Sequence, residues 1–97
     1  MKIVNFAEKN SELNRFVAEI RDIHIQQDRL RFRKNLERIG EVMSYEISKD
    51  FRYSEKLVTT PLGTARVNTA DDKIVIGTIL RAGIPYHQGF LNYFDRA

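Results

Sequence analysis

The sequence predicts an α/β fold in which helices, a β-hairpin and one buried strand follow one another along the chain. Three observations carry this prediction. Apolar residues recur at helical spacing in residues 1–50, residues 53–69 have the pattern of a hairpin arm, and residues 73–97 hold a nearly continuous apolar run followed by a second helical pattern. Because such a run is typical of a strand covered on both faces, we expect the first βα unit of a parallel sheet.

Two helices are expected in residues 1–50. Asn10 or Ser11 can cap the first helix through a side-chain oxygen. The second is expected to begin within residues 26–28, and its apolar residues form one stripe. Gly40 lies in this helix, where glycine costs up to about 1 kcal/mol relative to alanine and leaves room for another backbone. The apolar residues of the two patterns are Leu13, Phe16, Val17 and Ile20, and then Phe32, Leu36, Ile39, Met43 and Ile47.

The second half of the chain predicts the hairpin arm, one strand and one helix. Apolar residues flank a turn that Pro61 and Gly63 supply. Residues 73–80 form the predicted strand, and Pro85 suits the first turn of the helix that follows. A parallel strand followed by a helix requires a second parallel strand, yet the sequence ends at Ala97. We therefore expect residues 1–97 to be a single partial domain, cut after its first βα unit.

Composition narrows the class of protein. The chain has 97 residues, of which 42% are hydrophobic and 30% charged, as expected of a soluble globular protein. The sequence contains no cysteine, which excludes disulfides and thiolate catalysis. No apolar run approaches the roughly 20 residues of a membrane span, and "MKIVNFAEKN" is not a signal peptide. We expect a cytoplasmic protein that does not bind membranes.

The loop Leu80–Gly83, "LRAG", is the strongest candidate for a binding site. It follows the predicted strand, and ligands of α/β sheets bind at the carboxyl ends of strands. Ala82 and Gly83 let a ligand reach backbone N–H groups, and Gly83 can adopt a positive φ. Arg81 adds a planar cation, and the next helix directs its N-terminus at the loop. The loop therefore predicts a phosphate or pyrophosphate site; the alternative is a βα turn whose arginine is merely solvated.

The other candidate groups favour ordinary structural roles. The net charge is +3, and the basic run Arg29–Arg38 contains acidic residues and no aromatic platform. A solvated helix face is therefore favoured over nucleic-acid binding. His24 and His87 are far apart in the sequence and lack a cysteine or acidic partner, so we expect no metal site within the chain.

The sequence resembles the uracil phosphoribosyltransferase family over essentially all of its length. The resemblance lies in "ILRAG" after an Ile/Val strand, Gly89 in the following helix, Phe32-Arg33 and Tyr45-Glu46. It implies a type I phosphoribosyltransferase sheet. It also implies an enzyme of pyrimidine salvage that joins uracil to phosphoribosyl pyrophosphate and gives UMP and pyrophosphate.

The resemblance assigns roles to the loop. Leu80, Arg81, Ala82 and Gly83 would hold the pyrophosphate, with Arg81 neutralising the leaving group beside the Mg²⁺ that arrives with phosphoribosyl pyrophosphate. Such loops often contain a non-proline cis peptide, which we expect at Leu80–Arg81. A homodimer is implied as well, with the hairpin reaching the partner.

The chain also departs from the family pattern, at Pro85 and Gln88, and it contains no "DP-x-x-A-T-G" motif. We assign no catalytic residue within it and do not expect the isolated chain to be active. The alternative is a non-catalytic module for association or regulation. The DNA beyond codon 97 distinguishes the two, because an open frame with the missing motif favours the enzyme.

Overall fold

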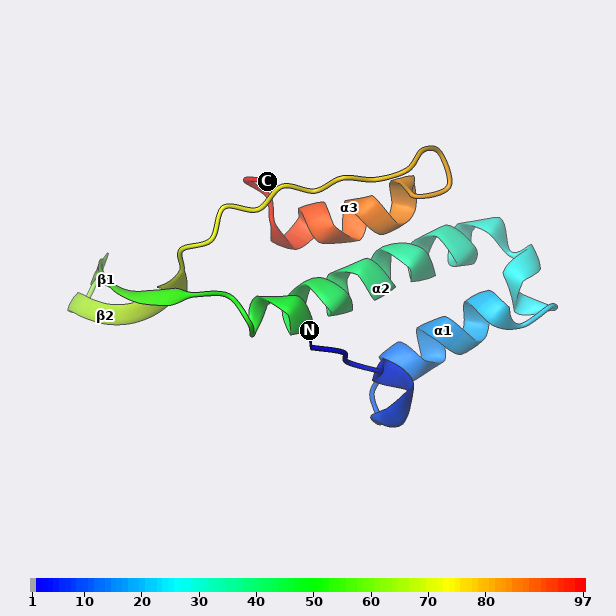
Figure 1. The fold of residues 1–97 in the computed structure, drawn as a ribbon, viewed down its shortest axis with the longest axis horizontal. Helices are drawn as coiled ribbons and strands as arrows, with labels where there is room; N and C mark the ends of the chain where they lie inside the picture. Colours follow the sequence, from blue (N-terminus) through cyan, green and yellow to red (C-terminus); the bar gives the residue numbers. More distant parts are fainter. Residues whose placement is uncertain (1) are drawn as a thin grey trace.

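The computed structural model describes residues 2–97, which form one layer of helices with a projecting hairpin (Figure 1). Helix α2 lies between α1 and α3, and the hairpin extends away from the helices beyond the end of α2. None of the described helices is long and apolar enough to cross a membrane. The elements are α1 (Leu13–Arg21), α2 (Arg29–Ser48), β1 (Tyr53–Thr60), β2 (Gly63–Ala70) and α3 (Ile84–Tyr93), with short 3-10 turns at Phe6–Glu8 and Ile25–Gln27.

The predicted helices of the first half are confirmed. Of the two candidate caps of α1, Ser11 is the one that bonds to the helix, because its Oγ accepts from the backbone N–H of Leu13 at 3.3 Å; the residue directly before the helix is Glu12, whose side chain makes no capping hydrogen bond. Helix α2 begins directly after Asp28, whose side chain accepts from the N–H of Arg31 at 3.0 Å. Leu13 and Ile39 form the small buried core, at 2% and 5% exposure.

Glu19 joins α1 to α2 through a hydrogen-bonded network. Its carboxylate accepts from Asn35 Nδ2 at 2.9 Å, from Arg31 at 3.1 Å and from Arg15 at 3.3 Å. Asn35 is fully buried, and its Oδ1 accepts from Arg38 at 3.0 Å. The hydrogen bonds from Asn35 and Arg31 lower the pKa of Glu19 below its usual value of 4.5.

This pKa predicts how stability depends on pH. Because the pKa of Glu19 is lower in the folded chain, its contribution is fully present above 4.5, the unfolded value, and is lost as the pH falls through the folded pKa. We expect Glu19→Gln to be less stable than the parent at neutral pH, with the difference shrinking in acid. Urea unfolding at several pH values measures this difference in the free energy of unfolding. A difference that stays constant across this range would show that the network is not charge-dependent.

Helices α2 and α3 cross at two glycines. A methyl group on Gly40 would lie 2.5 Å from the carbonyl oxygen of Tyr86 and 3.2 Å from Cα of Gly89. A methyl group on Gly89 would lie 2.9 Å from Cα of Gly40. The two backbones are therefore in direct contact, which confirms that the small residue at position 40 admits another backbone. This contact fixes α3, and with it the loop that precedes α3.

The predicted hairpin is confirmed as the antiparallel pair β1–β2, in which Tyr53 faces Ala70 and Thr60 faces Gly63. Pro61 and Leu62 make the turn, and Gly63 has a φ of +134°, a conformation that glycine adopts readily. The contacts that hold the hairpin to the rest of the chain lie at its base. Tyr53 donates to the carbonyl of Ser48 at 2.7 Å, and Arg52 pairs with Asp72 at 3.3 Å.

The strand predicted for residues 73–80 is not formed. The segment is extended and runs alongside α3 (Figure 1), but within residues 2–97 the hairpin is the sole sheet and no parallel pairing occurs. A strand requires a hydrogen-bonded neighbour, and none lies beside this segment among the described residues. One face alone is covered: Ile74 and Ile76 are half-buried, whereas Val75 is 93% exposed. The prediction of a strand covered on both faces is therefore wrong for this structure, which is a mixed α/β arrangement of three helices and a hairpin.

Candidate functional site

The loop at residues 80–83 is a tight turn between the extended segment and α3. The N–H of Gly83 donates to the carbonyl of Ile79 at 3.3 Å, and the N–H of Ile84 donates to the carbonyl of Arg81 at 3.1 Å. The N–H of His87 then donates to the carbonyl of Gly83 at 2.8 Å, in the first turn of α3. Pro85 lies in the same turn, as predicted. The chain thus reverses direction at Arg81.

Arg81 occupies the outer side of this turn. Its side chain is exposed and has no hydrogen-bond or ion-pair partner among residues 2–97. The peptide bond between Leu80 and Arg81 is cis, as the resemblance implies. The backbone N–H groups of Leu80, Arg81 and Ala82 likewise make no hydrogen bond within the described residues. The turn therefore combines one exposed guanidinium with three backbone N–H groups that have no partner among residues 2–97, and groups of these kinds bind phosphate oxygens.

Gly83 has a steric role in the turn, and the positive φ predicted for it is wrong. Its φ is −75° and its ψ −10°, so the positive φ that glycine permits is not used. Instead, a side chain at this position would collide with Oγ1 of Thr78 and would lie 2.6 Å from the carbonyl oxygen of Ile79. The space beside Gly83 is filled by the chain's own atoms. The turn can be this tight because residue 83 has no side chain.

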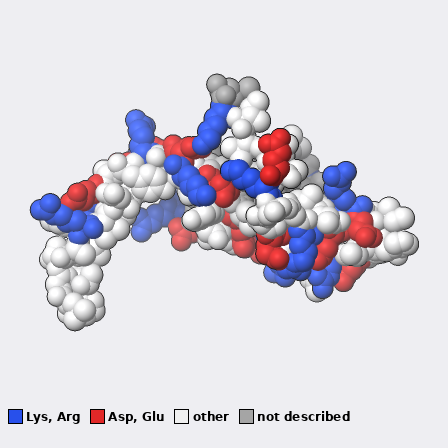
Figure 2. Space-filling view, turned by 90° about the horizontal axis from the view of Figure 1, so that it is seen from below, with Lys and Arg blue, Asp and Glu red and all other residues white. Residues whose placement is uncertain are grey.

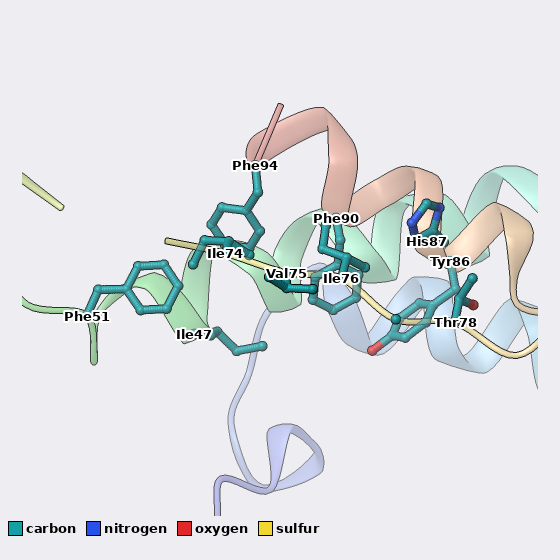
Figure 3. Close-up of a pocket in the computed structure, with 11 residues that line it drawn as sticks. Ile47, Phe51, Ile74, Val75, Ile76, Thr78, Tyr86, His87, Phe90 and Phe94 are labelled. Carbon is teal, nitrogen blue, oxygen red and sulfur yellow. The ribbon is translucent and has the colours of Figure 1, made fainter. Parts of the chain in front are cut away.

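An apolar cavity of about 340 Å³ lies behind the turn, between the extended segment, the end of α2 and α3 (Figure 3). Thr78 and His87 line it and join it to the turn. Tyr86 also lines it and donates to Sδ of Met43 at 2.7 Å, and burial raises the pKa of Tyr86. Sequence reasoning missed this cavity, although two of the phenylalanines that line it, Phe90 and Phe94, lie in the helix predicted after Pro85. The other lining residues are Ile47, Phe51, Ile74, Val75, Ile76, Gly77, Phe90 and Phe94.

The remaining candidates do not join this site. Three of the five basic residues of α2 are paired with acidic or amide groups: Arg31 contacts Glu19, Lys34 lies 3.8 Å from Glu37, and Arg38 donates to Asn35. Figure 2 shows Lys and Arg interspersed with Asp and Glu over the helices, as a solvated face requires. His24 is exposed and lies outside the cavity that His87 lines. Within residues 2–97 no group of three or more His, Asp or Glu side chains could hold a metal ion.

Comparison with known proteins identifies the family. The family model described as uracil phosphoribosyltransferase matches residues 7–97. A uracil phosphoribosyltransferase of Porphyromonas gingivalis is 58% identical over 95 residues, which cover 98% of this chain and 44% of the relative. One of Pyrococcus furiosus is 36% identical over 83 residues, covering 84% of this chain and 35% of the relative. The chain spans less than half the length of these relatives, and the match over nearly all of its residues shows that it belongs to the uracil phosphoribosyltransferase family.

Proposed function

We propose that this chain supplies the pyrophosphate-binding part of a uracil phosphoribosyltransferase, which joins uracil to phosphoribosyl pyrophosphate and gives UMP and pyrophosphate. The observation that carries the proposal is the turn at residues 80–83, in a chain that belongs to this family. The turn holds the exposed Arg81 and N–H groups that have no partner among residues 2–97, directly before the N-terminus of α3. This combination favours a multiply charged anion over a neutral ligand.

The role of the turn in the reaction follows from where charge develops. As the glycosidic bond to uracil forms, pyrophosphate leaves and its oxygens gain negative charge. The guanidinium of Arg81 and the N–H groups of Leu80, Arg81 and Ala82 donate hydrogen bonds to these oxygens, and such bonds strengthen as charge accumulates. Phosphoribosyl pyrophosphate binds as its magnesium complex, so the Mg²⁺ belongs to the substrate. Uracil is bound by parts of the enzyme outside this chain.

A fused enzyme tests the proposal. Residues 1–97 are joined to the part of the Porphyromonas gingivalis relative that follows its matched segment, and UMP formation from uracil and phosphoribosyl pyrophosphate is measured. We expect the fused enzyme to form UMP, and neither the 97-residue chain alone nor the added part alone to do so. A fused enzyme that unfolds cooperatively but forms no UMP would contradict the proposal.

We also propose that a second copy of this chain covers the hairpin. The outer half of the hairpin, residues 57–65, carries no charge, and it forms the uncharged finger at the lower left of Figure 2. Leu57 is 71% exposed and Leu62 100% exposed, with Val58 and Val67 exposed as well. Exposed apolar residues on a two-stranded sheet, with open strand edges, favour association with another chain.

Light scattering at micromolar concentration measures this association. We expect the parent chain to be a dimer. The variant Leu57→Ser/Leu62→Ser should dissociate at a concentration at least about 100-fold higher, because burying one leucine stabilises by about 1.5–3 kcal/mol and the variant removes two from each chain. The control is Leu30→Ser, which changes a 63% exposed leucine on α2 and should leave the dimer intact. A compact monomeric parent would contradict the proposal.

A further inference from the structure

The space beside Gly83 contains a hydroxyl group that the proposed function does not use. A Cβ built on Gly83 would overlap Oγ1 of Thr78, so the Cα–H bond in that direction points at this oxygen. Thr78 is exposed to solvent, and its Oγ1 makes no conventional hydrogen bond within residues 2–97. Figure 3 shows Thr78 beside Tyr86 and His87, at one end of the cavity behind the turn.

Two contacts therefore hold Gly83 against the end of the extended segment. Its N–H donates to the carbonyl of Ile79 at 3.3 Å, and its Cα–H faces the hydroxyl oxygen of Thr78. A Cα–H···O contact is weak, about half or less of a conventional hydrogen bond. However, it acts at the point where the turn closes, and Arg81 lies within the loop that these two contacts close. A small displacement of Gly83 therefore moves the groups that bind pyrophosphate.

We propose that Thr78 is a positioning residue for the turn: its hydroxyl oxygen packs against Cα of Gly83 and sets the direction in which residues 80–82 present their donors. This inference rests on the proposed function, because the ligand it serves is the pyrophosphate group. Thr78 itself touches no reacting atom. Its effect is on binding of phosphoribosyl pyrophosphate and not on binding of uracil.

Two substitutions separate the hydroxyl from the shape of the side chain. Thr78→Val keeps the branched shape but replaces the oxygen by a larger methyl group, whereas Thr78→Ser keeps the oxygen. In the fused enzyme we expect Thr78→Val to raise the KM for phosphoribosyl pyrophosphate about two- to fivefold. The KM for uracil and the unfolding temperature should stay unchanged, and Thr78→Ser should behave as the parent does. The control is Thr59→Val, which removes a hydroxyl from the exposed part of β1.

A second measurement does not depend on activity. In the 97-residue chain, NMR reports the chemical shifts of the Gly83 amide and α protons. We expect them to change in Thr78→Val and to stay near the parent values in Thr78→Ser. If Thr78→Ser and Thr78→Val shift them equally, the hydroxyl has no part in holding Gly83 and the inference is overturned.

The two proposals fail in different ways. If the unsubstituted fused enzyme forms no UMP, the proposed function fails, while the NMR comparison still decides whether Thr78 holds Gly83. If Arg81→Ala weakens phosphoribosyl pyrophosphate binding but Thr78→Val does not, the proposed function stands and the positioning role of Thr78 is overturned.

Discussion

Replacing Gly89 with alanine is expected to destabilise the chain by about 1–3 kcal/mol, the usual cost of adding a methyl group to a close-packed contact. The added Cβ would overlap the carbonyl oxygen of Glu37 and would lie 2.9 Å from both the backbone nitrogen of Glu41 and Cα of Gly40. All three are backbone atoms of α2, so none can rotate away as a side chain would. The helices must separate, and the buried contact between α2 and α3 is lost.

The sign of this effect is informative. In an unpacked helix, alanine stabilises by up to about 1 kcal/mol relative to glycine. Helical propensity therefore predicts stabilisation by Gly89→Ala, whereas the crossing of α2 and α3 predicts destabilisation. Guanidinium unfolding followed by circular dichroism distinguishes the two. If Gly89→Ala is more stable than the parent, the close crossing does not exist.

Gly77→Ala is the matched control for this experiment. Gly77 lies in the extended segment, and a methyl group there would meet no atom within 4 Å. We expect the stability of the Gly77→Ala variant to differ little from that of the parent. Gly40→Ala should resemble Gly89→Ala, because its methyl group would lie 2.5 Å from the carbonyl oxygen of Tyr86. The two changes act on one contact, so the double variant should cost less than their sum.

Local patterns were sufficient to predict the helices and the hairpin. Helix α2 follows from its apolar stripe and from Asp28, which satisfies the first N–H groups of the helix. The hairpin follows from apolar runs around a Pro-Gly turn. These elements form most of their hydrogen bonds internally or with a neighbour close in sequence, and for this reason the sequence pattern determines them.

The predictions that the structure does not confirm concern features that depend on residues far apart in the sequence. Residues 73–80 have the composition of a strand, but a strand also needs a neighbour, and no other part of the described chain pairs with them. A glycine at position 83 indicates either a positive φ or a close approach of other atoms, and the sequence alone does not distinguish the two. The structure shows that the requirement is space beside Thr78 and Ile79, not a positive φ. The cavity was missed because its lining comes from three separate parts of the chain.

Two kinds of observation predicted the candidate site: the residues of the loop, and the resemblance to a family. The residues alone predict an arginine directly before a helix N-terminus, and they predict that such a loop can bind an anion. The identity of the anion and the cis bond at Leu80–Arg81 came from the family resemblance. Periodicity and composition contain no information on either, because neither changes the pattern of apolar residues.

Replacing Arg81 with alanine should have the largest effect on function. In the fused enzyme we expect kcat/KM for phosphoribosyl pyrophosphate to fall about 10- to 100-fold, because a hydrogen bond to a charged group contributes about 1.5–3 kcal/mol. Inhibition by pyrophosphate should weaken in parallel, while the KM for uracil should stay unchanged. The fold should be unaffected, since the side chain of Arg81 contacts no partner among residues 2–97.

Two further variants show which property of Arg81 matters. Arg81→Lys keeps the charge but lacks the planar guanidinium that donates two parallel hydrogen bonds, so we expect a loss intermediate between parent and alanine. Arg29→Ala removes an equal charge from the exposed start of α2 and should leave the kinetics unchanged, which excludes a general effect of net charge. Arg81→Ala kinetics equal to those of the parent would show that the turn does not bind pyrophosphate. The arginine would then be solvated, and the anion would have to be held elsewhere in the enzyme.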